Sequence, residues 1–213
     1  MVIFSKKSNW HFKSYLLLLL CCFSFFGCTL LDPGPPPSFY TLNLNLPPAQ
    51  PGPALSSQLA IVMPDAGDML ASNRIVTKFE SGEIKFWANT VWSNPAPLLI
   101  QRKLVEAFEA TKVLTAMPQD SIGYLADFRL VSDLREFSVM LDQANQPAFV
   151  EVRIAAYVVD VRTGKSLAYL DNPVRAKVNN GSLGEVIAAY NQATSQAVNE
   201  IALWTIKVIK ENK

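Results

Sequence analysis

The chain has 213 residues, of which 50% are hydrophobic and 17% are charged, and its formal net charge is +1. Three of its 19 basic residues precede Cys28, so the remainder carries 16 basic against 18 acidic residues and is close to −2. The single histidine and the two other cysteines also precede Cys28. The chain beyond Cys28 therefore lacks the basic clusters of nucleic-acid binders, and it cannot form a disulfide, a Ser-His-Asp or Cys-His site, or a Cys/His zinc site.

The first 27 residues follow the three-part plan of a secretory signal peptide. Three lysines lie within residues 1–13, residues 15–26 form a continuous apolar run, and Gly27 places a small residue before Cys28. The run is shorter than the ~20 residues that a membrane-spanning helix needs. We therefore predict that residues 1–27 are a signal peptide.

The end of this leader resembles the bacterial lipoprotein signal, in which cleavage occurs before a cysteine that becomes lipidated. The resemblance implies cleavage before Cys28 and lipidation of its thiol, although Phe25 and Phe26 stand where Leu and a small residue are usual. Thr29, rather than Asp, follows the cysteine, which implies sorting to the outer membrane with the body facing the periplasm. An uncleaved anchor extending through Leu31 and plain secretion remain alternatives.

Residues 28–38 are predicted to be a lipidated cysteine and a tether, because a run of prolines opposes both helices and sheet ladders. Residues 39–213 are predicted to form one domain. Polar and apolar residues alternate in its first segment, which predicts a strand over residues 39–46, followed by a proline-rich loop over residues 47–53.

Further elements follow from periodicity and turn residues. Strands are predicted over residues 59–63, 74–79 and 83–92, the last two as a hairpin across Ser81-Gly82, and Pro95 and Pro97 open a helix over residues 98–111. Strands are then expected over residues 124–134, continuing or restarting at 137–141, and over residues 149–161 and 166–170, joined by a turn at residues 162–165.

The last element is a long amphipathic helix from Leu183 to about Val208. Ser182 and Glu185 have the spacing of a capping box at its start. This order of elements predicts an α/β (α+β) fold: a mixed, largely antiparallel sheet with two main helices packed on one face, after the signal peptide and tether.

Catalytic chemistry has little support in this sequence. The scattered Asp and Glu residues are better explained by a solvated surface than by a catalytic pair. Gly164-Lys165-Ser166 is similar to the end of a phosphate loop, but Val159 occupies the position of the required glycine. We predict that the chain is not an enzyme and that it has no catalytic residues, no metal site and no cofactor.

Aromatic residues leave two interpretations open. Four aromatic side chains either fill the core or line a pocket or interface: Trp87, Trp92, Phe86 and Trp204. By strand alternation, Phe86 and Trp87 should point to opposite faces of the sheet. We take Arg74, Trp87 and Trp92 as the candidates for contact with a partner or ligand.

The chain between residues 28 and 210 resembles the ABC-type transport auxiliary lipoproteins, which include the paraquat-inducible protein C (PqiC) type. The matching residues are Phe39-Tyr40-Thr41-Leu42, Asn73-Arg74-Ile75-Val76, Glu83-Ile84-Lys85-Phe86-Trp87-Ala88, Trp92, Pro95, Pro97-Leu98-Leu99 and Leu104. Thr77, where an aromatic residue is common, and the split prolines of residues 94–97 depart from the pattern.

The resemblance implies a non-enzymatic accessory subunit on the outer membrane. Its partner would be an MCE-domain protein of an ABC-type system that moves phospholipid or another apolar molecule between membranes. Self-association is compatible with the resemblance, and nucleic acid is not expected as a partner. The alternatives are a structural or assembly lipoprotein of another envelope complex and an envelope hydrolase.

Overall fold

The computed structural model describes residues 35–213, apart from residues 122 and 124. The predicted signal peptide, Cys28 and most of the predicted tether lie outside the described residues, as does Tyr124. The chain divides into Met1–Pro36 and Pro37–Lys213, and the second unit is described below.

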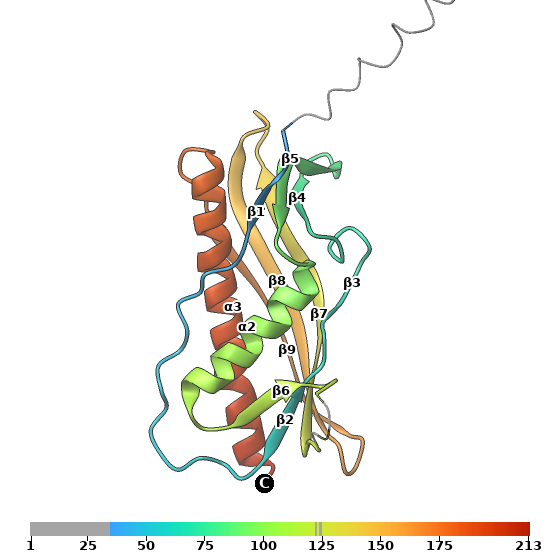
Figure 1. The fold of residues 1–213 in the computed structure, drawn as a ribbon, viewed down its shortest axis with the longest axis vertical. Helices are drawn as coiled ribbons and strands as arrows, with labels where there is room; N and C mark the ends of the chain where they lie inside the picture. Colours follow the sequence, from blue (N-terminus) through green and yellow to red (C-terminus); the bar gives the residue numbers. More distant parts are fainter. Residues whose placement is uncertain (1–34, 122, 124) are drawn as a thin grey trace, which may run out of the picture. The chain divides into compact units, whose positions relative to one another are not determined.

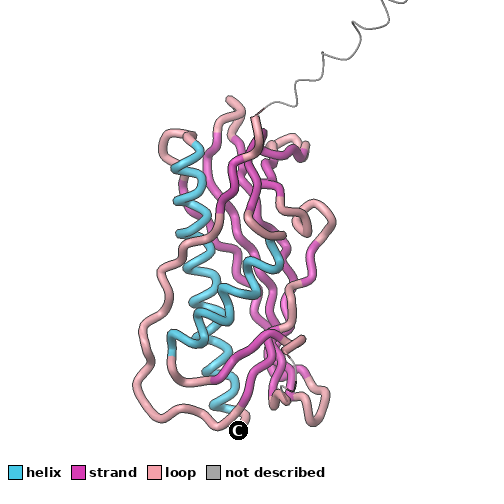
Figure 2. The backbone as a smooth tube through the Cα atoms, viewed as in Figure 1, coloured by secondary structure: helices cyan, strands magenta, loops and turns pink. Residues whose placement is uncertain are grey.

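In chain order, the described elements of this unit are five strands, a helix, four strands and a second helix (Figures 1 and 2). The strands are β1 (Ser38–Tyr40), β2 (Gln58–Ile61), β3 (Asp65–Ala66), β4 (Arg74–Lys78), β5 (Ile84–Trp92), β6 (Thr115–Pro118), β7 (Phe128–Leu141), β8 (Pro147–Asp160) and β9 (Ser166–Lys177). The helices are α2 (Ala96–Thr111) and α3 (Leu183–Glu211).

Strand β7 organises the sheet. One of its edges pairs with β8 along almost its whole length, and β8 pairs in turn with β9, so these three long strands form an antiparallel meander. The other edge of β7 pairs in succession with β2, β3 and β4, each of them parallel to it. Strand β5 pairs antiparallel with β4, and β1 and β6 add parallel edges. The sheet is therefore mixed, as predicted.

Both helices pack on the same face of this sheet and touch each other. Helix α3 lies against β8 and β9, while α2 lies against β6 and α3 (Figure 1). The alternate residues of β8 that face the helices, from Val150 to Val158, are almost completely buried, whereas most of their neighbours are partly exposed. No helix of the described residues covers the opposite face. The predicted α+β fold with two helices is confirmed.

The helix ends follow the predicted chemistry. Helix α2 begins after Pro95, with a proline in its first turn, where a missing backbone N–H leaves no helical bond unmade. The backbone N–H of Glu185 donates to the Ser182 side chain, so the first half of the predicted capping box is present. The Glu185 carboxylate instead accepts a hydrogen bond from Asn179.

The strand predicted over residues 39–46 is wrong beyond Tyr40. Residues 41–46 are extended, and Leu42 is buried, but they cross α3 instead of joining the sheet (Figure 1). The N–H groups of Asn43 and Asn45 donate to Asn191 and Ser195, at 2.9 and 3.0 Å. The side chain of Asn199 donates to the carbonyl of Asn45 at 2.8 Å. Side chains of α3 thus replace a neighbouring strand, and we call residues 41–46 the strap.

Other boundaries differ because pairing overrides local composition. Strands β3 and β6 have no counterpart among the predictions. Strand β3 has only two residues, and β6 (TAMP) lacks the continuous apolar run that indicated the equally short β2. Strand β9 continues past Leu170 to Lys177, through Pro173. Among the described strands it pairs with β8 alone, and an edge strand tolerates a proline because that residue lacks only a ladder donor.

Three aromatic side chains fill the core between the sheet and α3. The ring of Trp92 meets that of Tyr190 edge-on at 4.9 Å, and Phe137 lies 5.5 Å from Trp92 and 4.7 Å from Tyr190, between ring centres. The Tyr190 hydroxyl donates to the carbonyl of Phe137 at 3.3 Å. Burial raises the pKa of Tyr190 well above its ordinary value. This cluster joins β5, β7 and α3.

Trp92→Ala is expected to lower the free energy of unfolding by about 3–5 kcal/mol, because it removes a large buried side chain and leaves a cavity. Trp87→Ala is the matched control, since Trp87 contacts the core but is only partly buried. Urea denaturation followed by circular dichroism compares the two. Equal losses would contradict the assignment of Trp92 to the centre of the core.

Candidate functional site

The four residues singled out from the sequence do not form one site. Cys28 lies outside the described residues. Arg74 is exposed, with its guanidinium carbon 3.8 Å from the ring centre of Phe86. Trp87 packs against the core on the other face of β5, as strand alternation predicts. Trp92 is fully buried, so the core interpretation holds for it and its ring offers no surface to a partner.

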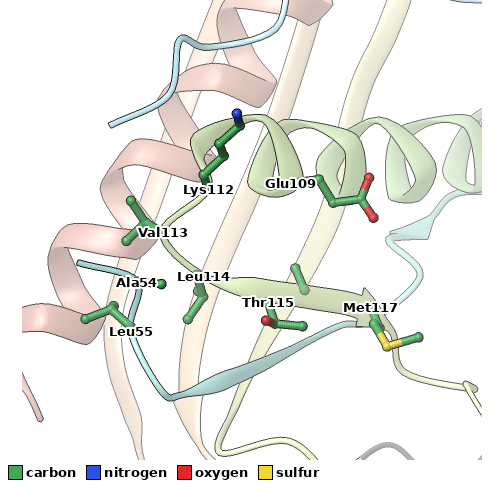
Figure 3. A pocket seen from close by; sticks show the side chains of 9 residues that line it. Ala54, Leu55, Glu109, Lys112, Val113, Leu114, Thr115 and Met117 are labelled. Atoms are coloured by element: carbon green, nitrogen blue, oxygen red, sulfur yellow. The ribbon is translucent and has the colours of Figure 1, made fainter. Parts of the chain in front are cut away.

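A shallow depression lies where α2 ends and β6 begins (Figure 3). Its volume is about 410 Å³, and its lining is mainly aliphatic, with Glu109 and Lys112 extending from the end of α2. Lys112 has a φ of 58°, the left-handed conformation that ends the helix. The lining contains no pair of groups placed for acid–base work. Within the described residues, no group of three or more His, Cys, Asp or Glu could hold a metal ion.

The open face of the sheet carries a network of charged side chains. Asp171 on β9 accepts two hydrogen bonds from Arg153 on β8, at 2.9 and 2.7 Å. It also accepts one from Arg135 on β7 at 2.6 Å. Arg135 donates further to Asp133 and to the Tyr169 hydroxyl, both at 3.0 Å. The network therefore joins all three strands of the meander.

Two more ion pairs extend this network toward the β4–β5 hairpin. Arg175 on β9 donates to Glu151 on β8 at 2.6 Å, and its guanidinium lies 4.8 Å from the ring centre of Phe149. Lys78 on β4 pairs with Glu136 on β7. Arg129, Arg135, Arg153 and Arg175 thus share the open face of the meander, and we call this surface the arginine face.

The anionic and cationic members of the arginine face differ in exposure. The carboxylates of Asp171, Glu151 and Glu136 are only 14–15% exposed, whereas their partners Lys78, Arg135, Arg153 and Arg175 are 30–64% exposed. The acids thus lie beneath the bases, with Asp133 as the exception at 43%. Solvent and any bound molecule therefore meet mainly the guanidinium groups.

The ion pairs set the protonation of the network. The hydrogen bonds from Arg153 are the main cause that lowers the pKa of Asp171 from 3.8 to about 2, and the charge of Arg135 acts in the same direction. The hydrogen bond to Asp133 raises the pKa of Arg135, and the hydrogen bond to Asp171 raises that of Arg153. Asp171, Arg135 and Arg153 are therefore all charged at neutral pH.

An aromatic ladder lies beside the charges. Val131, Tyr157 and Tyr169 are directly opposed on β7, β8 and β9, and the two tyrosine rings are 4.8 Å apart. Val131 and Tyr169 are 36% and 49% exposed. The sequence prediction did not identify this surface. Its signal was present as arginine and tyrosine at alternate positions of neighbouring strands, but recognising it requires the pairing register.

Comparison with known proteins identifies the family. The family model of the ABC-type transport auxiliary lipoprotein component matches residues 40–202. The chain belongs to this family. An uncharacterized protein from Bradyrhizobium diazoefficiens is 28% identical over 179 residues, which are 83% of this chain and 47% of that protein. This auxiliary lipoprotein chain therefore spans about half the length of the curated relative it matches.

Solved structures show that the fold recurs. A crystal structure of a Xanthomonas campestris protein, assigned to the family DUF330, superposes with a TM-score of 0.75 at 22% identity, covering 82% of this chain and 98% of that one. Another crystal structure, of an uncharacterized protein, gives a TM-score of 0.63 at 16% identity and covers 79% and 97%. None of the helices described in this auxiliary lipoprotein is long and apolar enough to cross a membrane.

Asp171→Asn is expected to change how the free energy of unfolding depends on pH in the acid range. Because the pKa of Asp171 is lowered from 3.8 to about 2, its ion pairs stabilise the folded state above pH 4 and lose that effect as the pH falls toward 2. The difference in unfolding free energy between wild type and variant should therefore be largest above pH 4 and shrink toward pH 2. Chemical denaturation at a series of pH values measures it.

Arg153→Met provides the complementary measurement, because it removes the main cause of the lowered pKa. In this variant the carboxyl resonance of Asp171, followed by NMR, should titrate at a higher pH than in the wild type. An unchanged titration would contradict the assigned pairing.

Proposed function

We propose that this chain is an outer-membrane lipoprotein that serves as an accessory subunit of an MCE-type ABC lipid transport system. The observation that carries the proposal is the family match over residues 40–202, and the lipoprotein-like sequence before these residues supports it. In this role the domain docks with a periplasm-spanning MCE protein and helps to maintain the membrane, while ATP hydrolysis occurs on another subunit.

The anchor is proposed from the leader. Lipid on Cys28, including a palmitate-type chain on the new amine, would hold the domain firmly, since two or three acyl chains anchor far better than one. Residues 29–37 would then connect the lipid to the folded unit, a span of at most about 30 Å at full extension. The domain would thus work within a short distance of the membrane on its periplasmic side.

A docking role agrees with the chemistry of the domain. The described residues bring carboxylates together with arginines in ion pairs, as in the network around Asp171, instead of pairing them with one another for acid–base work. The depression beside α2 is shallow and mainly aliphatic. We therefore propose a binding protein without catalytic activity.

Cys28→Ala tests the anchor. The variant should accumulate as the unprocessed precursor and should take up no label from radioactive palmitate, because the lipidated thiol and the cleavage site are both lost. Cys22→Ala is a matched control in the same leader and should be processed and labelled normally. Gel mobility and labelling report the outcome, and normal processing of Cys28→Ala would contradict the lipoprotein proposal.

Co-purification tests the partner. The full chain with a C-terminal affinity tag, expressed in its own host and extracted in mild detergent, should retain an MCE-domain protein that is identified by mass spectrometry. Deletion of the gene should increase the sensitivity of the envelope to detergents. Recovery of a pilus, secretion or lipopolysaccharide-export component in place of an MCE protein would instead support the alternative, an assembly role in another envelope complex.

A further inference from the structure

The open side of the sheet contains most of the arginines of the chain. Four of its seven arginines lie on β7, β8 and β9 with their side chains on this side, and Arg74 stacks on Phe86 on the same side of β4 and β5. The other two, Arg102 and Arg162, lie on α2 and in the β8–β9 turn. A solvated surface does not require this concentration on one face.

Partly buried carboxylates hold three of these guanidinium groups in place. Asp171 fixes Arg135 and Arg153, and Glu151 fixes Arg175, while the arginine side chains remain 32–64% exposed. A guanidinium group that is already oriented loses less conformational freedom when it binds a carboxylate in a bidentate manner. Arg129 has no ion pair among the described residues, and it is exposed. The face thus presents oriented and free cations to an anionic partner.

The distribution of charge favours an acidic protein over a membrane. Attraction to an anionic lipid surface depends on net charge, at about 1 kcal/mol for each basic residue near the surface. Here four acids balance their four basic partners in number and, within the described residues, leave only Arg129 of the four arginines of this face unpaired, so long-range attraction is weak. The acids are Asp171, Asp133, Glu151 and Glu136. Short-range complementarity remains, because the acids lie beneath the bases. Arginine and tyrosine are also among the residues that are enriched in protein interfaces.

The size of the face suits a protein interface. Strands β7 and β8 have 14 residues each, so the meander is roughly 45 Å long and about 15 Å wide. This area approaches the ~800 Å² that each partner contributes to a standard interface. The ladder of Val131, Tyr157 and Tyr169 supplies an apolar centre within it.

We propose that the arginine face is the docking surface for an acidic protein partner, one that presents Asp and Glu side chains around a small apolar centre. The apolar centre of the partner seats on Val131, Tyr157 and Tyr169, and its carboxylates bind Arg129 and the exposed edges of Arg135, Arg153 and Arg175. This inference rests on the accessory role proposed above, and it adds the surface used and the chemistry of the partner.

Photo-crosslinking of the full chain in its host tests the surface. A photoreactive phenylalanine analogue in place of Val131 should form a cross-link to an Asp- and Glu-rich segment of one envelope protein, identified by mass spectrometry. The matched control carries the same analogue in place of Leu203 on α3, which is 39% exposed where Val131 is 36% exposed. This control should give no such product.

Charge reversal tests the chemistry. Arg129→Glu should reduce the cross-link from position 131 by about tenfold, because it places like charges together in the interface. Arg102→Glu makes the same change on an exposed position of α2 and should leave the yield unchanged. Thermal melting verifies that both variants fold. Reversal of one acid in the cross-linked segment of the partner to Arg should restore the yield with Arg129→Glu.

Each outcome decides between the proposals. Cross-links from position 131 to lipid only or to a second copy of this chain, no cross-link there, or a yield that Arg129→Glu leaves unchanged would overturn the docking surface. If the full chain still retains an MCE protein in those cases, the proposed function stands without this surface. A charge-dependent cross-link to an acidic segment of a protein from another system supports the surface and overturns the proposed partner.

Discussion

The structure depends on β7, because every other described strand of the sheet except β1 pairs either with β7 or with a strand that does. Its 14 residues pair with β8 on one side, and on the other side with β2, β3 and β4 in turn. A short strand is stable only when its backbone groups are paired and one face is covered. Strand β7 supplies the pairing for three short strands, and α2 and α3 supply the cover. Phe137 on β7 also contacts Trp92 and Tyr190, so the same strand joins the core to α3.

The helices cover only one face of the sheet, and this has a consequence for the opposite face. Most residues of the meander that point away from the helices retain some exposure, so each must be compatible with both solvent and its cross-strand neighbours. Arginine meets this requirement, because its stem covers the strand while its head remains hydrated. Ala155 illustrates the result: it lies on the open face between Asp133 and Asp171 and is still completely buried. The arginine face thus shields the strands beneath it from solvent and, in our proposal, also binds the partner.

The long, periodic elements could be predicted from the sequence, and the short or exceptional ones could not. The β4–β5 and β8–β9 hairpins, α2 and α3 agree with the predictions to within a few residues, except for the late end of β9. Strand β6 lacks the continuous apolar run that indicated the equally short β2. The strap shows a pattern with a different meaning: Leu42 alternates with polar neighbours as in a strand, but its backbone partners are side chains of α3. Alternation reports which side is buried, and it does not report what forms the hydrogen bonds.

The candidate site illustrates the same limit more sharply. Arg74, Trp87 and Trp92 all belong to the hairpin predicted over residues 74–79 and 83–92. The structure separates them, because β5 directs Trp87 and Trp92 to the core side and leaves Phe86 on the open side with Arg74. The arginine face instead joins residues of three strands separated by up to 46 positions, from Arg129 to Arg175, which only the register brings together.

The strap adds a geometric reason for assigning different roles to the two sides of the domain. It follows directly after β1, the first strand beyond the predicted tether, and it is bound to Asn191, Ser195 and Asn199 at successive turns of α3. Helix α3 covers the inner face of β8 and β9, so the strap runs on the side opposite to the arginine face. The segment that follows β1 therefore leaves the meander unobstructed. In our proposal the strap and the partner therefore use opposite sides of the domain, and a strap that crossed the arginine face would instead compete with the partner for the same surface.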